Sequence, residues 1–180
     1  MNLKPNKAVF LDRDGVINEG VIRGGKPYPP QTVAEFKLLP GVSEAVMALK
    51  KAGYKIIVTT NQPDVSQGKQ KMEVIEAMHG LLKKWLPLDA IKVCFHVDSD
   101  NCECRKPKAG MIFEASKEFN IDLKKSFMIG DRWRDVEAGQ TAGCTCFFLE
   151  YDYKEKKPAQ PYIKVQSLLE AGQKIISGTF

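Results

Sequence analysis

Two carboxylates lie close together near the N-terminus, within residues 10–15. Asp12 and Asp14 are two positions apart and directly follow the short apolar run 8–11. An apolar run that ends in charged residues and glycine is typical of a buried strand whose last residues reach a sheet edge. Open α/β sheets bind their ligands at that edge. Because neighbouring carboxylates repel each other, the pair needs a bound cation or a proton on one member. A solvated loop carrying two aspartates is the alternative.

Further polar groups follow later apolar or cysteine-rich segments. Thr60 follows the run 55–58, Lys106 follows a group of cysteines, and Asp131 ends a third apolar run, four residues before Asp135. Each has an ordinary explanation when taken singly: a strand-end threonine, a solvated lysine, or an aspartate that caps a helix. Their order along one chain favours a shared site.

This order resembles the four-motif signature of the haloacid dehalogenase-like phosphatases, over about residues 9–149. The resemblance implies hydrolysis of a phosphate monoester through an aspartyl-phosphate intermediate. Asp12 is the expected nucleophile. Asp14 is the expected general acid and base, since side chains two apart on an extended strand emerge on the same side. Thr60 and Lys106 are expected to bind the phosphoryl oxygens that are not transferred.

The resemblance also implies a magnesium ion. Its expected protein ligands are the carboxylates of Asp12 and Asp131 and the backbone carbonyl of Asp14. Asp135 is expected to support this shell, directly or through water. Oxygen ligands are those that Mg²⁺ prefers.

A second group of side chains combines three thiols with one imidazole: Cys94, His96, Cys102 and Cys104. Four nitrogen and sulfur ligands are typical of a closed structural zinc site. Zinc in the loop 94–107 would hold Lys106 in place. A disulfide or free buried cysteines are the alternatives.

The zinc group and the Arg-Lys-Pro sequence after it resemble one zinc-containing subgroup of that superfamily. The subgroup comprises D-glycero-D-manno-heptose 1,7-bisphosphate phosphatases and histidinol-phosphate phosphatases. The resemblance implies that Arg105 recognises substrate and that Asn61 and Gln62 line the same pocket. The heptose bisphosphate, losing its 7-phosphate, is the expected substrate. Histidinol phosphate is the alternative, because the five-residue loop between His96 and Cys102 is short, as in those members.

Two other function classes fit the sequence less well. A phospho-accepting signalling module also phosphorylates an aspartate, but it needs no leaving-group acid such as Asp14. A polynucleotide 3′-phosphatase would be expected to carry a basic, aromatic-rich stripe, and the sequence shows none.

Composition predicts a single phosphatase domain over residues 1–180. The chain is 43% hydrophobic, enough for a sizeable core, and its net charge of +5 suits an anionic metabolite better than nucleic acid. No signal peptide or membrane-spanning run is visible, and thiols arranged for a metal suggest a reducing compartment. We therefore expect a cytoplasmic enzyme without nucleic-acid or membrane partners, as a monomer or weak homodimer.

The elements that position these residues alternate along the chain. Apolar runs predict strands at 8–11, 54–60, 91–96, 126–130 and 144–149. Helical patterns lie at 41–52, 69–86, 109–119, 134–142 and 167–176. This alternation predicts an α/β fold with a doubly wound, mostly parallel, Rossmann-like sheet. Residues 19–32 are expected to form a flap loop, and no large cap domain fits between the motifs. Residues 151–161 form a polar connector without an assigned role.

Overall fold

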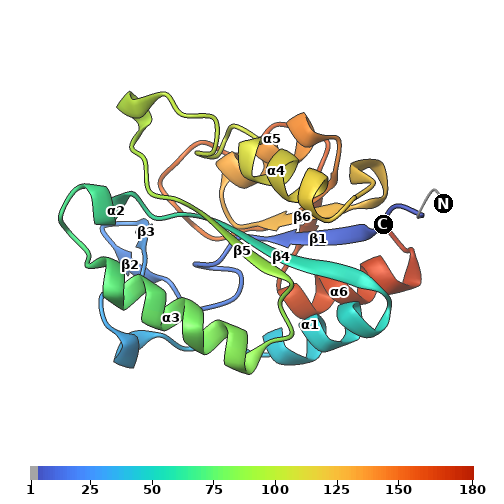
Figure 1. Cartoon of the computed structure of the whole chain (residues 1–180), viewed down its shortest axis with the longest axis horizontal. Helices are drawn as coiled ribbons and strands as arrows, with labels where there is room; N and C mark the ends of the chain where they lie inside the picture. The colour runs from blue at the N-terminus through green and yellow to red at the C-terminus, as the bar shows by residue number, and fades with distance from the viewer. Residues whose placement is uncertain (1–3) are drawn as a thin grey trace.

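The computed structural model describes residues 4–180, and a parallel sheet lies at its centre (Figure 1). The sheet has six strands in the order β5-β4-β1-β6-β7-β8. In that order the strands are β5 (Ala90–Cys94), β4 (Tyr54–Asn61), β1 (Lys7–Leu11), β6 (Phe127–Gly130), β7 (Thr145–Leu149) and β8 (Ile163–Val165). All five pairings between neighbours are parallel. The predicted doubly wound fold is confirmed.

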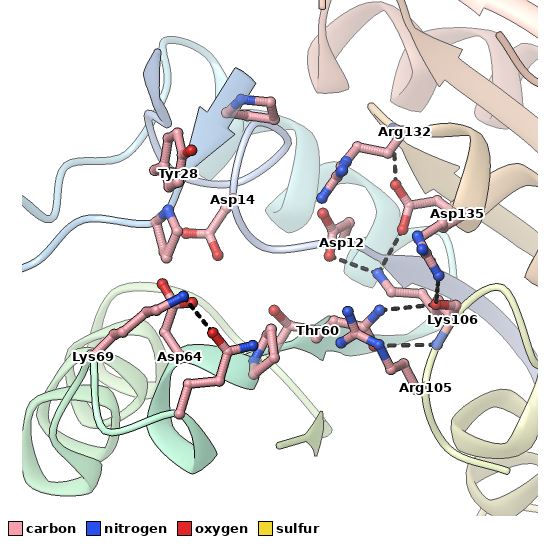
Figure 2. Close-up of a pocket in the computed structure, with 16 residues that line it drawn as sticks. Asp12, Asp14, Tyr28, Thr60, Asp64, Lys69, Arg105, Lys106, Arg132 and Asp135 are labelled. Carbon is pink, nitrogen blue, oxygen red and sulfur yellow. Dashed lines mark hydrogen bonds and ion pairs between the residues drawn. The ribbon is translucent and has the colours of Figure 1, made fainter. Parts of the chain in front are cut away.

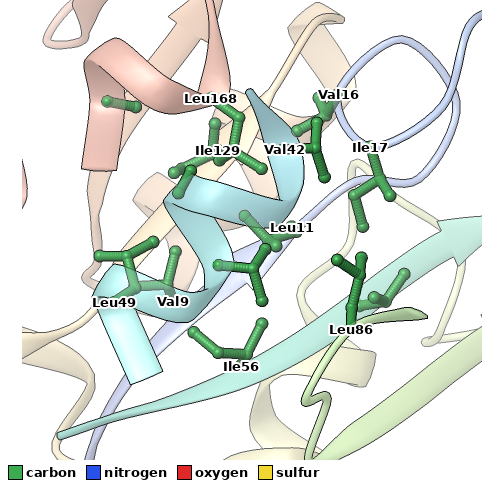
Figure 3. Packing of buried hydrophobic residues seen from close by; sticks show 14 of the residues in the cluster. Val9, Leu11, Val16, Ile17, Val42, Leu49, Ile56, Leu86, Ile129 and Leu168 are labelled. Carbon is green, nitrogen blue, oxygen red and sulfur yellow. The ribbon is translucent and has the colours of Figure 1, made fainter. Parts of the chain in front are cut away.

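Strand β1 is buried on both faces. Val9 and Leu11 belong to one hydrophobic cluster, part of which Figure 3 shows, whereas Ala8 and Phe10 belong to the other. Successive side chains of a strand point to opposite faces. A near-continuous apolar run is therefore what a strand covered by helices on both sides requires.

Helices cover the two faces of the sheet (Figure 1). One face carries α1 (Val42–Lys51), α3 (Met72–Trp85) and α6 (Leu168–Ser177), and the other carries α4 (Gly110–Glu118) and α5 (Trp133–Ala142). Apolar residues at helical spacing pack each helix on the sheet; in α1 they are Val42, Ala45, Val46 and Leu49. Within residues 4–180, no helix has the length and apolar character needed to cross a membrane.

The connections contain elements that the sequence did not predict. Residues 19–32 include an antiparallel hairpin, β2 (Val21–Arg23) and β3 (Lys26–Tyr28), where a loop was expected. The sixth strand β8 was also missed. The short helix α2 (Pro63–Ser66) follows β4, and three 3₁₀ turns lie at Val33–Glu35, Asp98–Asp100 and Leu123–Lys125. The described residues contain no inserted cap domain, as predicted.

The strand order fixes where the site lies. The chain runs from β1 through β4 to β5, and then returns to place β6 on the other side of β1. The direction of winding therefore changes between β1 and β6, where open α/β sheets bind ligands beyond the carboxyl ends of the strands. Asp12 directly follows β1, and Asp131 directly follows β6.

Candidate active site

Three buried carboxylates meet at the switch point between β1 and β6. Asp12, Asp131 and Asp135 each place an oxygen within 4.8 Å of the others, and each is at most 7% exposed. Asp135 comes from the first turn of α5. The sequence predicted all three for this site.

Lys106 is the cation that balances this group (Figure 2). Its Nζ lies 2.6 Å from Asp12 Oδ1 and 2.6 Å from Asp135 Oδ1, and it donates to the carbonyl of Thr59 at 2.7 Å. Burial alone would lower the pKa of Lys106, but the two carboxylates raise it above its usual value. Lys106 therefore stays charged beside Asp12.

One lysine does not neutralise three carboxylates. Burial and the charge of Asp135 raise the pKa of Asp12 to about 6, although Lys106 opposes this shift. Burial and the charges of Asp12 and Asp135 raise the pKa of Asp131 well above its usual value. Asp131 Oδ1 is buried without a hydrogen-bond partner. An unpartnered oxygen in a carboxylate group with excess negative charge fits a hard divalent cation such as Mg²⁺.

The other oxygen of Asp131 is held by the connector 151–161. Tyr153 donates its hydroxyl hydrogen to Asp131 Oδ2 at 2.8 Å, and Tyr151, stacked on Tyr153, donates to the carbonyl of Gly15 at 3.0 Å. Gly15 has φ +87°, and a Cβ there would lie 2.1 Å from Asp131 Oδ2. Neither tyrosine was predicted for the site, because the connector has neither periodicity nor a motif.

Asp135 caps a helix and also pairs with Lys106. Its Oδ2 accepts a hydrogen bond from the Arg132 backbone N–H at 2.9 Å and thereby caps α5. Its Oδ1 forms the ion pair with Lys106. A helix cap thus also supports the site.

Asp14 lies on the pocket wall, apart from the three clustered carboxylates. Arg13, Asn18 and Gln62 all donate hydrogen bonds to its carboxylate. Burial alone would raise the pKa of Asp14, but the charge of Arg13 and these hydrogen bonds hold it below its usual value. An ionised Asp14 can accept a proton from water.

The polar residues at the end of β4 connect the site to the loop 94–107. Thr60 lines the pocket, and its hydroxyl accepts a hydrogen bond from Gln62 at 2.8 Å. Asn61 exchanges two hydrogen bonds with the backbone of Lys106, at 3.0 and 3.2 Å. Asn61 lines the pocket as predicted. Gln62 is 1% exposed and does not line the pocket, but it donates hydrogen bonds to Thr60 and Asp14. Gln62 therefore orients those two side chains through its hydrogen bonds.

The pocket above these groups has a volume of about 490 Å³. Its outer wall includes Tyr28 of the hairpin, Arg105 and Arg134. Arg105 Nε donates to Asp98 at 2.7 Å, and Arg134 also pairs with Asp98. Figure 2 shows Lys69 on the same side of the pocket as Tyr28, across from Arg105. The cavity is thus anionic at its base and rich in basic side chains at its rim.

The predicted zinc residues converge beside the pocket. The Sγ atoms of Cys94, Cys102 and Cys104 and the Nδ1 of His96 all lie within 4.8 Å of one another. Cys94 Sγ is 3.7 Å from Cys102 Sγ and 2.9 Å from Cys104 Sγ, and neither distance fits a disulfide of about 2.05 Å. Tetrahedral ligands about 2.3 Å from a zinc ion lie roughly 3.8 Å apart. The separations of 3.7 and 3.5 Å approach this value, and that of 2.9 Å is shorter; the donor set of three thiols and one imidazole is one that zinc takes. None of the three cysteines forms a disulfide in this structure.

The sequence and structure are similar to those of known hydrolases. Residues 19–143 match the haloacid dehalogenase-like hydrolase family, a segment that begins after Asp12 and Asp14. The D-glycero-beta-D-manno-heptose-1,7-bisphosphate 7-phosphatase of Helicobacter pylori is 38% identical over 146 residues, 78% of this chain and 81% of that protein. The D-glycero-alpha-D-manno-heptose-1,7-bisphosphate 7-phosphatase of Campylobacter jejuni is 34% identical over 169 residues, 91% of this chain and 92% of that protein.

Two solved structures with the same fold belong to D,D-heptose 1,7-bisphosphate phosphatases. The one from B. bronchiseptica, in complex with magnesium and phosphate, has a TM-score of 0.83 and 25% identity, covering 96% of this chain and 99% of that one. The one from Burkholderia thailandensis has a TM-score of 0.67 and 26% identity, covering 95% and 99%.

Proposed function

Because this chain belongs to the haloacid dehalogenase-like hydrolases and is a phosphatase, we propose that it removes the 7-phosphate of D-glycero-D-manno-heptose 1,7-bisphosphate. The observation that carries the chemistry is the buried group of Asp12, Asp131 and Asp135 with Lys106 between its members. The similarity to heptose bisphosphate phosphatases over most of both chains supports the choice of substrate.

In the first half-reaction, an Asp12 carboxylate oxygen attacks phosphorus. The bond between phosphorus and the sugar oxygen breaks, and Asp14 gives its proton to that oxygen, so that the sugar leaves as an alcohol. Lys106 and Thr60 stabilise the charge on the phosphoryl oxygens that are not transferred. The products are an Asp12 acyl phosphate and the heptose 1-phosphate.

In the second half-reaction, Asp14 takes a proton from water, whose oxygen attacks phosphorus. The bond to Asp12 breaks, so inorganic phosphate leaves and both aspartates return to their starting states. The lowered pKa of Asp14 favours the ionised form that this second role needs, whereas its first role needs a proton, which the negative charge of a bound substrate phosphate would favour.

The proposed magnesium ligands are the carboxylates of Asp12 and Asp131 and the backbone carbonyl of Asp14, with Asp135 in support. A bound magnesium ion would neutralise the charge that develops on the phosphoryl group. We also propose zinc at Cys94, His96, Cys102 and Cys104. This site would fix the loop that carries Arg105 and Lys106, because four protein ligands leave no position for substrate.

The basic rim suits a second phosphate. Arg105 presents a planar fork of donors that matches phosphate oxygens, and Asn61 lies on the same wall. The small proposed substrate, the free thiols and the net charge of +5 support a cytoplasmic enzyme that works alone or as a weak homodimer, without nucleic-acid or membrane partners.

The test is phosphate release with Mg²⁺ from a panel of substrates. The panel contains both anomers of the heptose 1,7-bisphosphate, histidinol phosphate, other sugar phosphates and a 3′-phosphorylated oligonucleotide. We expect kcat/KM for one heptose anomer to exceed that of the other compounds by about a hundredfold or more, a difference of about 2.7 kcal/mol. A preference for histidinol phosphate or the oligonucleotide would contradict the proposed substrate.

A further inference from the structure

Arg13 lies between the two proposed catalytic aspartates in the sequence, but its side chain does not line the pocket. It is 0% exposed, whereas Asp12 and Asp14 line the cavity. Its guanidinium lies over the ring of Phe36, 5.6 Å from the ring centroid. A buried guanidinium needs partners both for its charge and for its N–H groups.

The partners of Arg13 are one carboxylate and one imidazole. Nε and Nη2 donate to Asp14 Oδ1 at 3.2 and 3.0 Å, and Nη2 lies 2.9 Å from Asp14 Oδ2. Nη1 lies 3.1 Å from His79 Nε2 on α3. Within residues 4–180, Asp14 is the single ion-pair partner of Arg13. The guanidinium therefore joins Asp14 to helix α3.

His79 is suited to accept a hydrogen bond from a cation. Burial and the charge of Arg13 lower the pKa of His79 to about 4; Lys83 acts in the same direction, and Asp14 opposes it. The imidazole is therefore neutral at pH 7, and its Nε2 lone pair can accept the Nη1–H. A neutral acceptor binds the guanidinium without competing with Asp14 for its charge.

We propose that His79 is a positioning residue for proton transfer, which orients Arg13 so that Arg13 holds the Asp14 carboxylate at the pocket wall. This proposal rests on the general-acid role proposed for Asp14. Neither Arg13 nor His79 lines the pocket. Both act on the step in which Asp14 gives its proton to the departing alkoxide as the P–O bond breaks.

The test compares two leaving groups. An alkoxide needs the proton from Asp14, whereas p-nitrophenolate leaves readily without it. We expect His79→Leu to lower kcat/KM for the heptose bisphosphate about tenfold or more, and that for p-nitrophenyl phosphate by less than about twofold. kcat/KM is the correct quantity because it covers the steps up to loss of the alcohol and excludes the later attack of water.

Two further variants separate this role from packing. His79→Gln supplies an amide oxygen that can accept from Arg13, and it should restore most of the alkyl phosphate rate. Lys83→Gln, one turn further along α3, is the control and should leave both rates unchanged. Equal losses on both substrates in His79→Leu would show a structural role and overturn the proposal. Unchanged rates on both would also overturn it.

Asp14→Asn is the reference that distinguishes the two levels of failure. If Asp14→Asn slows the alkyl phosphate selectively but His79→Leu does not, the positioning role alone is wrong. If Asp14→Asn lowers kcat/KM equally for both substrates, both the acid role of Asp14 and the positioning role of His79 are wrong. If the wild type does not hydrolyse the heptose bisphosphate, the best alkyl phosphate of the panel replaces it, since any alkoxide needs the proton.

Discussion

The hydroxyl of Tyr153 donates a hydrogen bond to Asp131 Oδ2 over 2.8 Å, while Oδ1 of the same carboxylate is buried without a partner. One oxygen is thereby fixed, and the other is left for a cation. Tyr153 lies 22 residues after Asp131, on the connector between β7 and β8. The proposed magnesium site thus depends on a segment outside the four motifs.

Removing the Tyr153 hydroxyl should weaken magnesium binding. In Tyr153→Phe, Asp131 loses the bond that sets its orientation, so we expect the Kd for Mg²⁺ to rise about tenfold. Titration calorimetry on the metal-free protein measures this without catalysis. Tyr162→Phe removes the hydroxyl of a tyrosine whose ring packs on Phe148 and which does not line the pocket, so it should leave the Kd unchanged. A wild-type Kd in Tyr153→Phe would refute the role of the hydroxyl.

Removing one thiol of the proposed zinc group should lower metal content and stability. Cys102→Ser is expected to lose most of its zinc, measured by mass spectrometry, and to melt at a lower temperature, because a closed metal site stabilises the fold that forms it. The phosphoryl-transfer step should be affected less than stability. Cys144→Ala is the matched control, since Cys144 is a buried free cysteine outside the group. Full zinc content in Cys102→Ser would contradict the assignment.

Asp12→Asn should stabilise the metal-free protein at neutral pH. The folded pKa of Asp12 is raised from 3.8 to about 6, so ionisation of Asp12 destabilises the fold increasingly as pH rises through this window. The amide removes that charge. We expect the gain in melting temperature, variant minus wild type in EDTA, to be larger at pH 7.5 than at pH 4.5.

The difference between the two proteins is needed because His79 acts in the opposite direction. Its folded pKa is lowered from 6.5 to about 4, so it adds stability as pH rises through the same range. This contribution is present in both proteins and cancels. A gain that is equal at both pH values would show that Asp12 is not held in an environment that disfavours its charge.

The sequence predicted the base of the site because its residues follow buried strands. Asp12, Thr60 and Asp131 each come directly after or at the end of an apolar run, and parallel strands bring their carboxyl ends to one edge. The zinc residues were predicted because thiols and imidazoles at short spacing have few other uses. Both predictions depend on local patterns.

What the sequence did not predict depends on tertiary contacts. Tyr153 lies in an aperiodic connector, and β8 has three residues, too few for an alternating pattern. Arg13 is buried only because Asp14 and His79 meet it, and charged residues are otherwise expected at the surface. The hairpin could have been predicted from a local pattern, because Gly24-Gly25 between two short extended segments favours a two-residue turn.

The most direct test of the central claim follows both phosphates of D-glycero-D-manno-heptose 1,7-bisphosphate by ³¹P NMR, with Mg²⁺, in the wild type and in Asp12→Asn. We expect the 7-phosphate signal to convert to inorganic phosphate while the 1-phosphate signal persists. Asp12→Asn should retain less than about 0.1% of the rate, since it lacks the nucleophile. Initial loss of the 1-phosphate would contradict the proposed reaction, and more than a few per cent of residual rate in Asp12→Asn would contradict the proposed nucleophile.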